Sequence, residues 1–126
     1  MYDNVGIKWY KFNLPAMNAG EYNSTYGCNV VTLTTNDILD SWITEYHHYI
    51  QGACCHNGLL YATNGITNGS GTYAPTVRVI DPTSHQEIAT FHVAADGITD
   101  EAECIDFYEG KLHYGTPHYM YMFTLY

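Results

Sequence analysis

Four short apolar runs separated by turn-forming residues occupy the middle of the chain and restrict what it can fold into. The runs cover residues 49–56, 59–63, 76–80 and 87–93. Between the first two, Asn57-Gly58 readily adopts the positive φ angles that a two-residue hairpin needs. Before the last run, Asp81-Pro82-Thr83-Ser84 is a turn sequence in which proline fixes φ. These signals predict a four-stranded antiparallel sheet in which each strand pairs with the next.

The first two runs recur further along the chain. Residues 103–114 (ECIDFYEGKLHY) align without a gap with residues 51–62 (QGACCHNGLLYA). The second segment begins 52 residues after the first. A sheet pattern that repeats at this spacing is typical of an array of similar sheets. We therefore expect an all-β fold, a β-propeller segment of two to three four-stranded antiparallel blades. The expected organisation is N-terminal strands with a partial blade in 1–48, a complete blade in 49–93, and a last blade, one strand short, in 94–126.

The last predicted blade has strands near residues 103–108, 111–115 and 119–125, and it lacks a fourth strand. A strand predicted at residues 5–14 is unpaired at the N-terminus, and it could close this blade, either in the same chain or in a neighbouring copy. Two or three blades cannot close a ring or hide their edges. We therefore expect self-association, with a trimer of two-blade chains favoured, or completion of the ring by further sequence.

The first 48 residues are less clearly patterned. Residues 5–14 alternate imperfectly and predict a strand, residues 16–26 form a polar connection, and the β-branched residues of 28–34 predict another strand. In residues 35–48, a Thr-Asn-Asp sequence could cap a helical turn that runs through Trp42. A strand is the open alternative for that segment.

Charge and composition exclude several classes of function. Thirteen acidic residues against four basic ones give a formal net charge of −9, which repels nucleic acids and anionic membranes. No apolar run approaches the ~20 residues of a membrane span, and the polar N-terminus is not a signal peptide. An extracellular or virion-surface location is favoured nonetheless, by another route or as part of a longer chain. The composition, with 13 tyrosines, suits a surface that stacks and hydrogen-bonds, and equally any tyrosine-rich sheet protein.

The four cysteines, Cys28, Cys54, Cys55 and Cys104, lack the spacing of a zinc site. We predict that they are buried free thiols. Cys54 and Cys55 are adjacent in a predicted strand, so their side chains point to opposite faces of the sheet.

Three segments, QGACCHNGLLYATNG, TVRVIDPTSHQEIATF and DEAECIDFYEGKLHYGT, resemble the blade repeats of β-propellers related to the glutamine cyclotransferase-like and NHL-type groups. They are also similar to the propeller domains of tailed-phage receptor-binding proteins. The resemblance covers roughly residues 49–126 and implies the fold more than an activity, because propellers host many functions. The chain departs from the usual E-x-E-G segment at Cys104, where glycine is expected.

In a propeller, the loops at residues 64–73, 94–103 and 116–118 would share one face, and the two hairpin turns would lie on the other. Gln51 and Glu103 would begin equivalent inner strands near the axis, where they could hydrogen-bond sugar hydroxyls or satisfy backbone groups at the strand start. The candidate ligand-binding residues are Gln51, Tyr73, Glu101, Glu103 and His118.

These residues favour non-catalytic recognition of a carbohydrate or cell-surface polymer. One alternative is an enzyme of the cyclotransferase or lyase type that uses Glu103 as acid and base, and another is a purely structural module of a virion or surface assembly. No nucleophile motif of the G-x-S-x-G kind occurs, so no catalytic residue is assigned. No cofactor is expected. Asp96, Asp100 and Glu101 offer hard oxygen ligands for calcium, but their loop lacks the order of a calcium-binding motif.

Overall fold

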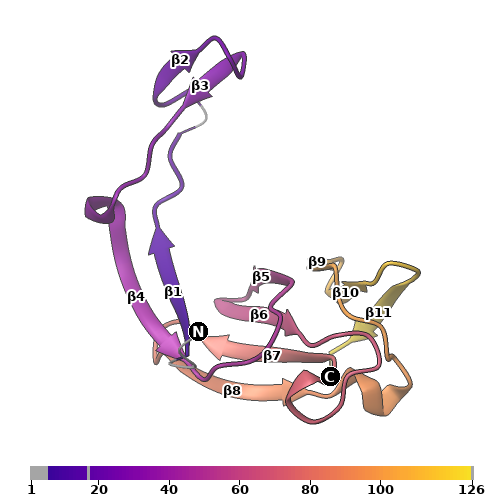
Figure 1. Cartoon of the computed structure of the whole chain (residues 1–126). Helices are drawn as coiled ribbons and strands as arrows, with labels where there is room; N and C mark the ends of the chain where they lie inside the picture. The colour runs from indigo at the N-terminus through magenta and orange to yellow at the C-terminus, as the bar shows by residue number, and fades with distance from the viewer. Residues whose placement is uncertain (1–5, 17, 126) are drawn as a thin grey trace. The chain divides into compact units, whose positions relative to one another are not determined.

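A computed structural model describes residues 6–16 and 18–125 of the chain (Figure 1). It contains strands and three short 3-10 turns, so the predicted all-β class is confirmed. The chain divides into two compact units, one over residues 8–43 and a larger one that combines the residues before Lys8 with those from Thr44 onward. Within the described ranges, no helix is long and apolar enough to span a membrane.

The larger unit contains the predicted four-stranded antiparallel sheet, in the order β5-β6-β7-β8. Its strands are β5 (Gly52–His56), β6 (Leu59–Asn64), β7 (Thr76–Asp81) and β8 (Gln86–Phe91). Asn57 and Gly58 have φ angles of 49° and 78°. Both residues of this turn are therefore left-handed, as the tight turn between paired β-strands requires.

A three-stranded antiparallel sheet follows, in the order β11-β10-β9. Its strands are β9 (Cys104–Tyr108), β10 (Lys111–Gly115) and β11 (Met120–Thr124). Its first hairpin repeats that of the other sheet residue for residue, because Cys104 pairs with Gly115 where Gly52 pairs with Thr63. The internal repeat in the sequence is therefore also a repeat of strand register. Glu109 and Gly110, at φ angles of 49° and 74°, make the equivalent turn.

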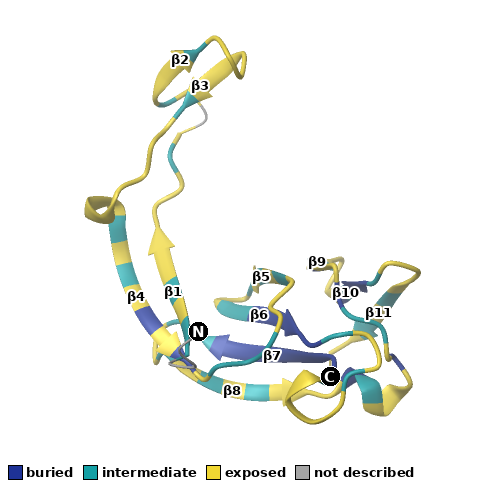
Figure 2. Ribbon diagram, in the orientation of Figure 1, coloured by how far each residue is buried: buried dark blue, intermediate teal, exposed yellow. Residues whose placement is uncertain are grey.

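The two sheets share one hydrophobic core, visible in Figure 2 as the buried parts of β6, β7 and β10. The buried members are Tyr61, Val77, Val79, Val93, Ile98, Ala102, Ile105, Leu112 and Tyr114. At the edge of this core, the ring of His56 stacks on Phe107 with 3.9 Å between ring centroids. The strands β5 and β9 lie side by side, and a Cβ atom on Gly52 would lie 3.5 Å from the Cα of Cys104. The first strands of the two sheets are thus neighbours.

All four cysteines are free, but the prediction that they are buried was wrong, since Cys28, Cys55 and Cys104 are exposed. Cys54 is partly buried against the core, and burial raises the pKa of its thiol to about 11. Cys55 follows it in β5 and lies on the exposed face, as strand alternation requires.

In the smaller unit, β1 (Ile7–Phe12) pairs with β4 (Ile38–Thr44), and β2 (Glu21–Asn23) pairs with β3 (Cys28–Val30). The strand predicted at residues 5–14 therefore pairs with β4, and the expectation that it could close the last sheet of its own chain was wrong. Its first residue lies outside the described part of the chain. Trp9 of β1 stacks on Trp42 of β4, with ring centroids 6.4 Å apart, which gives this pair an aromatic contact.

The segment left open by the sequence contains a 3-10 turn, Thr35–Asp37, followed directly by β4. Thr34 caps the turn, because its hydroxyl accepts a hydrogen bond from the Asn36 N–H, and Asp37 accepts one from the Thr34 N–H. Trp42 lies in the strand, so the strand alternative is correct there and the helical turn is much shorter than considered. The hairpin of β2 and β3 was not expected, because its three-residue strands are too short for periodicity to detect. A partial blade within residues 1–48 stays a prediction.

Candidate ligand-binding face

Three loops of the larger unit converge at one end of its strands. The Asn68 N–H donates to the Thr99 carbonyl at 2.7 Å, and the Glu101 N–H donates to the Thr67 hydroxyl at 3.2 Å. These bonds join the loop of residues 64–75 to the loop of residues 94–103. The turn of residues 116–119 joins them through His118, described below. We call this set the loop face; the two hairpin turns lie at the opposite strand ends.

The loop of residues 64–75 has a defined backbone structure. It includes the 3-10 turn Gly71–Tyr73, and the Ile66 N–H donates to the Tyr73 carbonyl at 3.0 Å. Gly65 has a φ angle of 104°, and a Cβ atom there would lie 2.5 Å from the carbonyl oxygen of Ala74. Only glycine fits where the two ends of the loop approach so closely. The glycines therefore shape this loop, which presents Tyr73 near its end.

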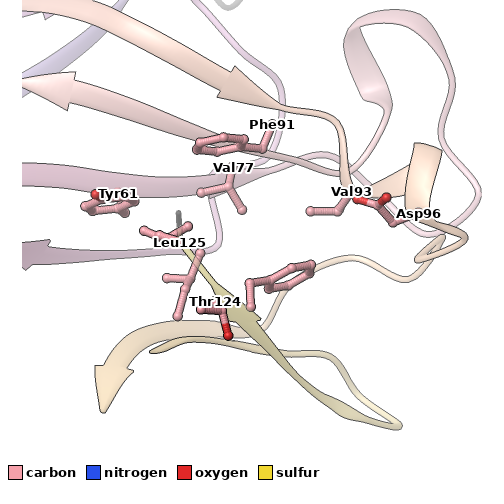
Figure 3. Close-up of a pocket in the computed structure, with 9 residues that line it drawn as sticks. Tyr61, Val77, Phe91, Val93, Asp96, Thr124 and Leu125 are labelled. Carbon is pink, nitrogen blue, oxygen red and sulfur yellow. The ribbon is translucent and has the colours of Figure 1, made fainter. Parts of the chain in front are cut away.

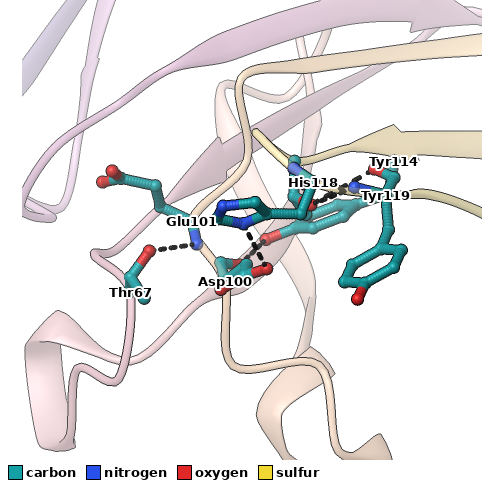
Figure 4. A network of polar contacts seen from close by, with 7 residues as sticks. Thr67, Asp100, Glu101, Tyr114, His118 and Tyr119 are labelled. Carbon is teal, nitrogen blue, oxygen red and sulfur yellow. Dashed lines mark hydrogen bonds and ion pairs between the residues drawn. The ribbon is translucent and has the colours of Figure 1, made fainter.

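A polar network connects the other two parts of the loop face (Figure 4). The His118 Nδ1 lies 3.3 Å from a carboxylate oxygen of Asp100, and the His118 side chain is 68% exposed. The buried Tyr114 hydroxyl donates to the Asp100 carbonyl at 3.3 Å. Burial, with a smaller contribution from the Asp100 charge, raises the pKa of Tyr114 to about 12. Tyr114 is therefore a neutral donor that holds the loop, while His118 is open to solvent.

The structure places Gln51 and Glu103 at equivalent positions immediately before β5 and β9. The Gln51 N–H donates to the Thr63 carbonyl, and the Glu103 N–H donates to the equivalent Gly115 carbonyl, at 3.2 and 2.7 Å. Their side chains differ. The Gln51 side-chain amide donates to the Glu101 carboxylate at 3.3 Å, whereas the exposed Glu103 carboxylate has no hydrogen bond or ion pair among the described residues.

An aromatic group that the sequence analysis missed surrounds Tyr73. The His48 ring stacks on Tyr73 with a centroid distance of 4.1 Å and an interplanar angle of 12°, and Tyr46 packs edge-on against His48 at 4.9 Å. Tyr49 lies tilted to Tyr73 at 6.2 Å. We call Tyr46, His48, Tyr49 and Tyr73 the aromatic cluster. The consecutive aromatic residues 46–49 were its only sequence signal, and their partner in the later loop was not predictable from it.

A largely apolar cavity of about 490 Å³ lies between the two sheets of the larger unit (Figure 3). Its lining residues are Tyr61, Val77, Phe91, Val93, Asp96, Leu112, Phe123, Thr124 and Leu125. They come from both sheets, from the 3-10 turn Val93–Asp96 and from Leu125, which follows β11. Asp96 is the one carboxylate among them. None of the predicted ligand-binding residues contributes to this cavity.

No group of three or more His, Cys, Asp or Glu side chains able to hold a metal ion is found in the described ranges. Of the three residues considered for calcium, Asp100 pairs with His118 and Glu101 with Gln51, while Asp96 lines the apolar cavity. The carboxylates of Asp100 and Glu101 thus each have a side-chain partner, and Asp96 belongs to the lining of a separate cavity.

Comparison of the chain with protein-family models, curated proteins and solved structures finds no match.

Proposed function

We propose that this chain is a non-catalytic binding module of the β-propeller type that recognises a carbohydrate or surface polymer at its loop face. The observation that carries the proposal is the convergence of the three loops, which brings exposed hydrogen-bonding groups and the two exposed tyrosines of the aromatic cluster to one end of the sheets. Tyr73 and Tyr49 are 39% and 56% exposed. Such rings offer flat apolar surfaces for a sugar ring, while neighbouring amides and carboxylates bind its hydroxyls.

The repeated register supports the propeller part of the proposal. Successive sheets begin with equivalent strands, β5 and β9, and these strands are in contact. In a radial array the first strands of neighbouring blades lie closest together around the axis. Gln51 and Glu103 would then line that axis.

The charge of the chain narrows the ligand class. With a formal net charge of −9, the protein repels sulfated, phosphorylated and other polyanionic polymers at low salt. An uncharged or cationic glycan is therefore the favoured ligand.

Replacing Tyr73 with alanine, or Glu103 with glutamine, should weaken retention on an immobilised glycan panel about 3- to 10-fold, while the melting temperature stays close to that of the wild type. The reason is that each change removes one contact, worth about 1 kcal/mol, from an exposed side chain. Tyr108→Ala is the matched control, since Tyr108 is exposed at the opposite strand ends. Absence of wild-type binding to any glycan of the panel would contradict the proposal.

Assembly into a ring completes the proposed binding module. Along the described chain, β11 has one hydrogen-bonded neighbour, whereas β7, its equivalent in the first sheet, also pairs with β8. The open edge of β11, which carries the exposed residues Met120 and Met122, can pair with a strand of another copy.

Self-association should therefore be visible in solution. We expect light scattering coupled to size exclusion to give three times the chain mass of 14.2 kDa. A monomeric mass that persists on concentrating the protein would rule out ring closure by copies of this chain.

A further inference from the structure

Arg78, one of four basic residues in the chain, lies fully buried in β7. Its Nε donates to the Asn64 side-chain oxygen at 3.0 Å, and its Nη1 donates to a Glu87 carboxylate oxygen at 2.8 Å. The other Glu87 oxygen accepts a hydrogen bond from the Thr90 hydroxyl at 2.6 Å. The guanidinium is thus neutralised by a carboxylate that is itself held in place.

A cavity of about 170 Å³ borders this network. The lining residues are His47, Asn64, Gly71, Thr72, Ala74, Thr76, Thr90 and His92, of which Gly71, Thr72 and Ala74 belong to the loop face. The cavity therefore lies next to the 3-10 turn that presents Tyr73. We call it the Thr76 cavity.

Unpaired polar atoms collect around the Thr76 cavity. Thr76 is 5% exposed, and its hydroxyl, which belongs to a cavity-lining side chain, has no hydrogen-bond partner in the described structure. The Nε2 of His47, a second cavity-lining side chain, is also buried without a hydrogen bond, at 3.7 Å from Glu87. A buried polar atom costs stability unless it gains a partner, so these atoms mark a place for a polar group from outside the chain.

The chemistry of the lining favours an uncharged partner. The Arg78 charge is already balanced by Glu87, which would repel an added anion. Burial, followed by the nearby Arg78 charge, lowers the pKa of His47 below its ordinary value, so its ring is neutral at pH 7. The Thr76 hydroxyl and a neutral imidazole can each donate and accept, as a sugar hydroxyl does.

We propose that the Thr76 cavity binds a single uncharged, hydroxyl-rich ring, such as one unmodified sugar residue, through hydrogen bonds to Thr76, His47 and Asn64. The inference rests on the proposed function, in that it gives the loop face a pocket for one residue of the glycan. The cavity proposal can also be tested separately, because a free monosaccharide should enter the Thr76 cavity without the rest of the polymer.

The test is a titration of the full ¹⁵N-labelled chain with D-glucose, D-galactose and N-acetyl-D-glucosamine, followed by amide chemical shifts. At least one sugar should shift the amide signals of Thr76, His47 and Thr90, with those of the distant hairpin turns unchanged. Sodium acetate and inorganic phosphate serve as anionic probes. No shift with any sugar, or shifts only with the anions, would overturn the proposal.

Thr76→Val keeps the shape of the side chain and removes its hydroxyl. It should weaken sugar binding about 5- to 10-fold, as expected for one lost hydrogen bond, without lowering the melting temperature. Thr63→Val is the matched control, because Thr63 is also buried but its hydroxyl donates to the Gly52 carbonyl. That variant should lower the melting temperature and leave sugar affinity unchanged. Equal sugar affinity of Thr76→Val and wild type would contradict the proposal.

The two proposals fail in different ways. Glycan retention that depends on Tyr73 and Glu103, with no monosaccharide effect on Thr76, would leave the loop face standing and remove the cavity. If a monosaccharide shifts the amide signal of Thr76, but changes at Tyr73 and Glu103 leave polymer retention unaffected, the cavity proposal stands and the loop-face proposal fails.

Discussion

Replacing Arg78 with alanine is expected to lower the free energy of unfolding by about 3 kcal/mol, the lower end of the ~3–5 kcal/mol typical of a broken buried ion pair. The lower end applies because the Glu87 side chain is 22% exposed and can recover some hydration. The change also leaves the Asn64 side-chain oxygen without its buried donor. Urea denaturation followed by intrinsic fluorescence measures the effect.

Two further variants make this test specific. Lys111→Ala removes an exposed basic residue and should change stability by no more than about 0.5 kcal/mol. The double variant Arg78→Met/Glu87→Leu should recover much of the loss, since apolar residues can replace a buried ion pair at little net cost. A loss below about 1 kcal/mol in Arg78→Ala would mean that the pair contributes little.

The same ion pair predicts how stability depends on pH. Burial raises the pKa of the Glu87 carboxyl, but hydrogen bonds from Thr90 and Arg78 outweigh it and leave the pKa below its ordinary value of 4.5. A carboxyl with a lowered pKa in the folded state stabilises the fold above 4.5 and loses that contribution as pH falls through the folded value. The wild type should therefore lose more stability than Arg78→Ala as the pH is lowered from 4.5.

The second large effect is expected at Tyr114, which is fully buried in the core shared by the two sheets. Tyr114→Ala should lower the free energy of unfolding by about 3–5 kcal/mol, as is typical when a large buried aromatic side chain is truncated. Its ring packs edge-on against Phe123 at a centroid distance of 6.4 Å, and that contact would be lost. Thermal unfolding followed by near-ultraviolet circular dichroism measures the change.

Tyr114→Phe separates the ring from the hydroxyl. This variant keeps the packing of the ring and removes the 3.3 Å hydrogen bond to the Asp100 carbonyl. It should therefore lower the free energy of unfolding by about 1 kcal/mol or less. Tyr108 is exposed, so Tyr108→Ala should leave the free energy of unfolding nearly unchanged. If Tyr114→Ala produced two separate transitions, the two sheets would not share one cooperative core.

Local signals were enough to predict the strands of the larger unit. Asn57-Gly58 and the apolar runs on either side of it specify a hairpin through φ preferences and through burial of one face, both of which depend on adjacent residues. The gapless alignment of the two segments predicted that Gln51 and Glu103 begin equivalent strands, and the structure adds that the two hairpins have the same register. In the smaller unit, three-residue strands such as β2 were missed, since so few residues show no period.

Local sequence signals could not predict the side-chain contacts that define the candidate sites. Nothing near Arg78 in the sequence indicates a buried charge; it is buried because β7 lies between β6 and β8, where Asn64 and Glu87 can reach its guanidinium. His48 and Tyr73 stack only because a glycine-shaped loop returns to the start of the sheet. The sequence alone thus determined the all-β class, the turns and the repeat, which follow from neighbouring residues. Tertiary structure decided which distant side chains meet, because that depends on how loops and sheets pack together.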